Sequence, residues 1–166
     1  APAVDLSDLP HLLRHSFRAS RKAMVRAQRR GTAADFHEWR KSVKSLWYQL
    51  RLAERLVAGL DSEIREFNQL ETALGEEHNL VVLRTKLTGD KDLRHLKNQL
   101  NNVVAMVNVL QEEIRRSTVV LGTRLHSASP KEFAKDLQRR LRPKGVRARK
   151  QAQSAQSRPA GAGTAA

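Results

Sequence analysis

The stretch from His37 to Arg55 carries basic residues at the spacing of one helix face. At about 100° per residue, these residues and Tyr48 fall within roughly 60° of His37. No acidic residue enters this row, because Glu38 and Glu54 lie outside it. Stacked like charges repel each other on a helix by a few tenths of a kcal/mol per pair, so the row favours an anion lying along it. The residues of this His37 row are His37, Arg40, Lys41, Lys44, Tyr48, Arg51 and Arg55.

A second basic row precedes it in the sequence. Arg18, Lys22, Arg26 and Arg29 share one side of a predicted helix, with Arg21 close to them. This Arg18 row and the His37 row would together form a positive groove or slab. Arginine can bind two phosphate oxygens at once and lysine acts as a mobile point charge, so a linear polyanion fits them. The alternative interpretation is a solvated basic face without a ligand.

The aromatic residues near the rows have different predicted roles. Trp39 falls opposite the His37 row, together with Val43, Leu46 and Leu50. We therefore expect Trp39 and Trp47 to pack in the core or at the edge of the groove rather than to stack on bases. Tyr48 lies within the row, and we expect its hydroxyl to contact the ligand.

Catalytic and metal-binding patterns are weak. The pair His37-Glu38 is not followed by the second histidine of a zinc-protease helix, and no glycine-rich phosphate loop is present. His11 and His15 are four residues apart but have no evident third ligand. Glu76, Glu77 and His78 could suggest acid–base chemistry, yet a helix kink or a solvated edge is the simpler interpretation. We predict a non-enzymatic binding protein with no cofactor and no metal.

Composition supports an acidic partner. The 166 residues include 31 Lys and Arg against 17 Asp and Glu, which gives a formal net charge of +14. This excess predicts binding to nucleic acid, an anionic lipid surface or another polyanion. A hydrophobic fraction of 40% is enough for a modest core, and the absence of cysteine excludes disulfides and thiolate metal sites. No apolar run approaches the roughly 18 residues of a membrane span, and we expect a cytoplasmic protein.

Helical start and stop signals are frequent, and strand signals are missing. We predict an all-α, antiparallel up-down four-helix bundle with a short extra C-terminal helix. The first predicted helix starts at Asp8 and Pro10 and ends at a turn at Gly31-Thr32, and the second runs over 33–58. The third runs over 63–87 with an interruption near Gly75, the fourth begins near Lys91, and the fifth runs over 130–141.

The last two of these helices have the clearest local signals. The fourth has an amphipathic face, and Ser129-Pro130-Lys131-Glu132 is a capping box for the fifth. We place the bundle at 1–142 and a disordered basic tail at 143–166. The residues of the amphipathic face are Leu93, Leu96, Leu100, Val103, Val107, Leu110 and Ile114.

Three motifs occur in a fixed order between about Phe17 and Leu141. The first motif is His37-x-x-Arg40-Lys41-x-x-Lys44-x-x-Trp47-Tyr48. The second is Leu74-Gly75-Glu76-Glu77-His78-Asn79-Leu80-x-Val82-Leu83. The third consists of Leu121-Gly122-x-Arg124-Leu125 followed by Ser129-Pro130-Lys131-x-Phe133. Together they resemble the CHAD family, the conserved histidine α-helical domain. The resemblance implies a helical domain that binds inorganic polyphosphate through basic residues. The residues that it implicates are His37, Arg40, Lys41, Lys44, Arg21, Lys22, His78 and Arg124.

Two features depart from the family pattern. Asn79 replaces an aspartate that usually follows the histidine. The family usually has two related four-helix halves, and this chain resembles only the second. The chain is then a fragment of a longer domain, a single half that is sufficient for function, or one copy of a homodimer in which two copies replace the two halves. A homodimer would cover the apolar face that a lone half exposes.

Three functional hypotheses follow. The first is binding of inorganic polyphosphate, with association to polyphosphate granules. The second is RNA or DNA binding without sequence specificity, with phosphate contacts from the basic tail. Low aromatic content, 4% of the chain, argues against a platform for stacked bases. The third is a structural or targeting module that docks on an acidic protein.

Overall fold

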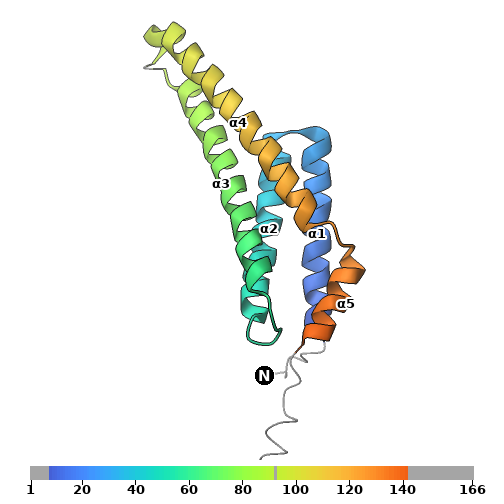
Figure 1. Cartoon of the computed structure of the whole chain (residues 1–166). Helices are drawn as coiled ribbons and strands as arrows, with labels where there is room; N and C mark the ends of the chain where they lie inside the picture. The colour runs from blue at the N-terminus through green and yellow to red at the C-terminus, as the bar shows by residue number, and fades with distance from the viewer. Residues whose placement is uncertain (1–7, 92, 142–166) are drawn as a thin grey trace, which may run out of the picture.

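The computed structural model describes residues 8–91 and 93–141. Within these residues five α-helices follow one another without a β-sheet, which confirms the predicted all-α class (Figure 1). The helices are α1 (Leu9–Arg30), α2 (Ala33–Ala53), α3 (Asp61–Gly89), α4 (Lys97–Leu125) and α5 (Pro130–Arg140), with a short 3₁₀ helix, η2 (Arg94–Leu96), before α4. The predicted tail at 143–166 lies outside the described residues.

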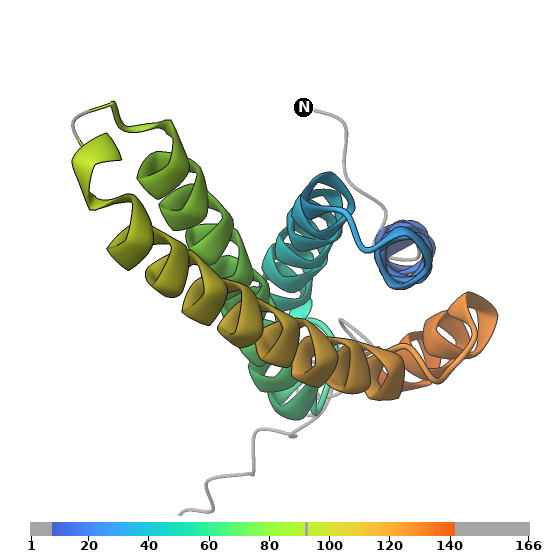
Figure 2. The same cartoon turned by 90° about the horizontal axis from the view of Figure 1, so that it is seen from above.

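Helices that are neighbours in sequence are antiparallel neighbours in space from α1 to α4, and α5 packs on α1 (Figures 1 and 2). The tight turn between α1 and α2 depends on Gly31, whose φ of 64° is in the left-handed region that favours glycine. Thr32 then caps α2, because its hydroxyl accepts a hydrogen bond from the Asp35 amide at 3.1 Å. The two helices that carry the basic rows are therefore held side by side.

Two predicted helix boundaries and one predicted interruption were wrong. α2 ends at Ala53 rather than Ala58, because the Ala58 amide donates to the carbonyl of Arg140 at 3.0 Å. This contact with the end of α5 replaces a further turn of helix. The fourth helix begins at Lys97 rather than near Lys91, and α3 continues through Gly75 without interruption. The capping box at Ser129 was predicted correctly.

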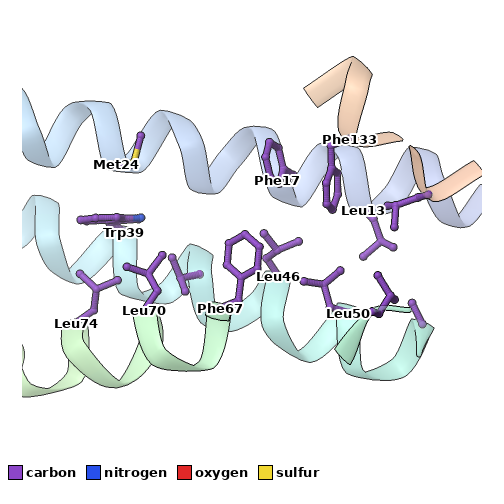
Figure 3. Packing of buried hydrophobic residues seen from close by; sticks show 14 of the residues in the cluster. Leu13, Phe17, Met24, Trp39, Leu46, Leu50, Phe67, Leu70, Leu74 and Phe133 are labelled. Carbon is purple, nitrogen blue, oxygen red and sulfur yellow. The ribbon is translucent and has the colours of Figure 1, made fainter. Parts of the chain in front are cut away.

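The core fills the space between α1, α2, α3 and α5 (Figure 3). Phe133 of α5 stacks on Phe17 of α1 with ring centroids 4.2 Å apart. Trp39 is 0% exposed, as predicted, and its indole lies between Met24 and Leu74. This indole also fixes the position of α4, whose Gly122 lies directly against it.

A buried ion pair joins α3 to α4. The Glu77 carboxylate accepts from Arg115 Nε at 2.9 Å, from Arg115 Nη2 at 2.7 Å and from Gln111 Nε2 at 2.7 Å. Arg115 Nη1 also donates to the carbonyl of Gly31 at 2.9 Å. The interpretation of Glu77 as a kink or solvated-edge residue was wrong, since Glu77 is 1% exposed and connects three segments.

His126, at the end of α4, is a second buried polar contact. Its Nδ1 lies 2.9 Å from the Gly122 carbonyl, which can only accept, so Nδ1 carries the proton. Nε2 then accepts from the Ser20 hydroxyl at 3.0 Å. Burial lowers the pKa of His126 to about 4, and the charge of Arg21 acts in the same direction. The fold therefore requires a neutral imidazole.

The free energy of unfolding should consequently depend on pH between about 6.5 and 4. The unfolded chain protonates His126 near the ordinary histidine pKa of 6.5, whereas the folded protein takes up this proton only near pH 4. Stability is therefore complete above pH 6.5 and falls as the pH is lowered, by about 2 kcal/mol between pH 7.5 and pH 5. Denaturant titrations at both pH values measure it. A His126→Asn variant should lose less over the same interval, and an equal loss in both proteins would contradict the assignment.

The amphipathic prediction for α4 was correct for only part of the helix. Val107 is buried, but Leu96, Val103 and Leu110 are exposed. Figures 1 and 2 give the reason, because the α3–α4 hairpin extends beyond the end of α1 and α2 that carries the Gly31 turn. In this extension α4 packs along α3, and its apolar side chains Val103 and Leu110 are left exposed.

Candidate functional site

The His37 row lies on the side of α2 opposite the core. Trp39, Val43, Leu46 and Leu50 on the other side are fully buried. From His37 to Arg51 the row is about 21 Å long at 1.5 Å per residue. Its exposed members on α2 are Lys41, Lys44, Tyr48 and Arg51, whereas His37 and Arg40 are half-buried against α3. The placement of Arg55 on this helix face was wrong, because Arg55 lies in the turn that follows the end of α2.

Two histidines meet where α2 contacts α3. The rings of His37 and His78 have centroids 4.9 Å apart and an interplanar angle of 37°. His37 Nδ1 is buried without a hydrogen-bond partner among the described residues, which leaves Nε2 as the nitrogen that a ligand can reach. The structure thus brings His78 of the second motif to the His37 row of the first.

Arg40 is engaged by α3. Its Nη2 lies 3.1 Å from Glu71 Oε1, and both side chains are largely buried. The guanidinium also lies over Gly75, where an added Cβ would be 3.5 Å from Nε. The pattern of the His37 row did not predict this contact with Glu71. A signal was present on α3, because Glu71 lies seven residues, or two helical turns, before His78 and therefore on the same helix face. Arg40 is therefore partly neutralised and held in place.

The middle of the row is less neutralised. Lys41 contacts Glu38 at 3.0 Å, but this pair is well exposed and contributes little. Lys44 and Arg51 form no ion pair within the described residues. The Arg51 guanidinium lies over the Trp47 ring at 5.0 Å. Arg51 is positioned on an aromatic surface and keeps its full charge.

The Arg18 row faces outward on the neighbouring helix. α1 has seven Lys and Arg residues and no Asp or Glu. Its core side carries the buried residues Leu13, Phe17 and Met24. Arg18, Lys22 and Arg26 are exposed and, in the described part of the chain, without an ion pair. Since α1 and α2 bury their apolar sides in one core, each row lies on the face of its helix that points away from this core.

Two predicted site residues lie elsewhere. Arg21 is half-buried and close enough to His126 and to Glu132 of α5 to affect the pKa of each, so it lies on the α5 side of α1. Arg124 of α4 contacts Glu66 of α3 at 3.5 Å. Because Trp39 points from α2 towards α4, the His37 row points away from Arg124.

A family model for the CHAD domain matches residues 3–88, just over half of the chain. The chain belongs to the CHAD domain family. The matched residues include both basic rows and His78 of this CHAD domain, whereas Arg124 and the Leu121–Phe133 segment lie outside them. Searches of curated proteins and of solved structures found no significant match.

Two other observations concern partners. None of the helices in the described ranges is long and apolar enough to cross a membrane. Nor do the residues described here contain a group of three or more His, Asp or Glu side chains placed to hold a metal ion. His11 and His15 belong to no such group, and Asn79 is exposed on α3. The two basic rows are therefore the candidate binding site of this domain.

Proposed function

We propose that this CHAD domain binds inorganic polyphosphate along the His37 row, with the Arg18 row beside it, and catalyses no reaction on it. The observation that carries the proposal is the alignment of exposed cations without carboxylate partners along the outward faces of the neighbouring helices α1 and α2. Some cations elsewhere in the described residues are paired, as in Arg115 with Glu77 and Arg140 with Glu63. Others, such as Lys131 on α5, are exposed without an ion pair, so the proposal depends on the alignment of unpaired cations along two neighbouring helices. A polymer of phosphates supplies the missing negative charges and releases its condensed counterions.

The shape of the surface favours a linear ligand over a small anion. The His37 row is open and about 21 Å long, and its charges are spaced about 5–6 Å apart. Nε2 of His37 lies at one end of this path and Arg51 at the other, with Lys44 between them. The path has one well exposed aromatic ring, Tyr48. Stacking of successive bases needs several such rings, so the surface suits phosphate better than single-stranded nucleic acid.

The carboxylates near the row support binding rather than catalysis. Glu71 is held by Arg40, and Glu38 lies outside the row in an exposed pair with Lys41. Phosphoryl transfer requires carboxylates that are free to hold magnesium ions. We therefore assign Arg40 a positioning role, with Glu71 fixing its guanidinium, and we assign the main charge contacts to Lys44 and Arg51.

A double charge reversal tests the proposal. Lys44→Glu with Arg51→Glu should weaken binding of long-chain polyphosphate at least tenfold, since each change removes an attraction and adds a repulsion. Both side chains are exposed, so the fold should be retained. Calorimetric titration measures the affinity, and circular dichroism checks the fold.

The matched control reverses two charges on α5. Lys131→Glu with Lys135→Glu changes the net charge equally, and both residues lie on a helix that packs on α1 rather than on α2. This variant should keep most of the affinity. If the two variants lose affinity equally, only the net charge matters and the assignment to the His37 row is overturned.

A further inference from the structure

A cleft between α1 and α5 lies outside both basic rows. α5 packs beside the first half of α1 (Figure 1), and the two helices enclose an open cleft of about 400 Å³ on one side of their contact. None of the described residues that line this α1–α5 cleft belongs to the His37 row or to the Arg18 row. Its polar lining consists of His11 and Arg14 from α1 and of Lys131, Lys135 and Gln138 from α5.

Every charged side chain among the described lining residues is basic. Arg14 is half-buried, and Lys131 and Lys135 are exposed. None of the three forms an ion pair within the part of the chain that the structure describes. Cations that line one cavity repel each other, and a bound anion turns this repulsion into attraction. The imidazole of His11 and the amide of Gln138 add N–H donors to the same space.

The carboxylates of α5 do not neutralise the cleft. The two lysines of the cleft are four residues apart on one flank of the helix, whereas Glu132 and Asp136 are four apart on a different flank. Glu132 accepts from the Ser129 amide at 2.7 Å in the capping box. Asp136 contacts Arg140 Nε at 2.8 Å. Lys135 is close enough to Glu132 to act on its charge but forms no ion pair with it, so the cleft keeps its positive charge.

The two walls of the cleft are fixed relative to each other. Phe133 of α5 stacks on Phe17 of α1 with an interplanar angle of 13°, and Arg14 lies three residues before Phe17 on α1. At its other end α5 is held by Arg140, whose Nη1 donates to the Gly59 carbonyl at 2.9 Å. The cationic walls are therefore in place before a ligand arrives, which lowers the cost of binding.

The size and charge of the cleft define its ligand. A volume of about 400 Å³ is in the range of small-molecule pockets, roughly 300–1,000 Å³, whereas the His37 row is an open path. One guanidinium can bind two phosphate oxygens and each lysine adds a point charge. A single carboxylate would leave most of this charge unmatched. We propose that the α1–α5 cleft binds a short oligophosphate, either free or as the triphosphate group of a nucleotide. This site does not depend on the proposed function of the His37 row.

Calorimetric titration with inorganic tripolyphosphate tests the site. Lys131→Glu with Lys135→Glu should weaken binding at least tenfold, because each change places a like charge beside the anion. Lys44→Glu with Arg51→Glu is the matched control, since it changes the net charge equally but leaves the cleft intact. This control should retain most of the tripolyphosphate affinity, and unfolding curves should show that both variants stay folded. A wild type that does not bind tripolyphosphate, or equal weakening in the two variants, would overturn the proposal.

Arg14→Gln tests the same site without adding a repulsive charge. It should weaken tripolyphosphate binding about fivefold, since it removes the forked contact, and it should leave the affinity for long-chain polyphosphate nearly unchanged. The two proposals can therefore fail independently. ATP titrated in parallel distinguishes the two sources, because an affinity similar to that of tripolyphosphate assigns the cleft to nucleotides and a much weaker one assigns it to free oligophosphate. An unchanged tripolyphosphate affinity in Arg14→Gln would contradict the assignment to this cleft.

Discussion

Replacing Glu77 by alanine is expected to destabilise the domain by about 3–5 kcal/mol, the cost of leaving one member of a buried ion pair without its partner. Arg115 is 15% exposed and donates twice to the Glu77 carboxylate. Without Glu77 the guanidinium keeps the Gly31 carbonyl, a long contact to Glu112 and its position over the Phe36 ring. Equilibrium unfolding in denaturant measures the loss.

Glu112→Ala is the matched control for this prediction. Glu112 contacts the same guanidinium at 3.5 Å, but its side chain is 62% exposed. A pair of this kind contributes roughly 0–1 kcal/mol, so the control should unfold almost like the wild type. Both changes remove a carboxylate from Arg115, but only Glu77 is buried and accepts short hydrogen bonds. Similar losses in the two variants would mean that the Glu77 contact is not the connection between α3 and α4.

Gly122→Ala should destabilise the domain by about 2–3 kcal/mol through overpacking. An added Cβ would lie 2.8 Å from Cη2 of Trp39 and closer still to Cζ2, with Met24 Sδ at 3.1 Å. The indole is fully buried and rigid, so it cannot move aside as a flexible surface chain could. α4 must therefore shift away from α1 and α2. Thermal and denaturant unfolding both report this loss.

The sign of the effect makes the Gly122 experiment decisive. Alanine normally stabilises a helix interior over glycine by roughly 0.5–1 kcal/mol. Gly75→Ala is the control, since a Cβ there meets Arg40 only at 3.5 Å, an ordinary contact. We expect Gly75→Ala to be neutral or stabilising. Adding Trp39→Phe to Gly122→Ala should recover part of the lost stability, because it removes Cζ2 and Cη2 of the indole. A Gly122→Ala variant that is more stable than the wild type would contradict the close packing.

The sequence was sufficient for the parts of the fold that local signals determine. The Gly31 turn, the Ser129 capping box and the burial of Trp39 follow from residue type and spacing, and all three were predicted. The end of α2 was not, because the contact between Ala58 and Arg140 joins residues that are 82 positions apart. Such a contact depends on where α5 docks on α1.

The candidate site was predictable to a similar extent. Helical periodicity placed the His37 row on one face, and the family motif added His78. Periodicity within one helix could not show that Glu71 neutralises Arg40 or that Arg124 lies on another side of the bundle. Glu77 was misjudged for the same reason, since a carboxylate becomes structural only through partners on other helices, here Gln111 and Arg115.

The dependence of polyphosphate affinity on salt, measured beside RNA of matched phosphate concentration, tests the central claim most directly. Binding by the unpaired cations of the two rows predicts that log affinity falls linearly with log salt, with a slope of roughly −0.7 for each phosphate neutralised. Polyphosphate should bind more tightly than the RNA at every salt concentration. An affinity that does not change with salt, or RNA that displaces polyphosphate at equal phosphate concentration, would contradict this account.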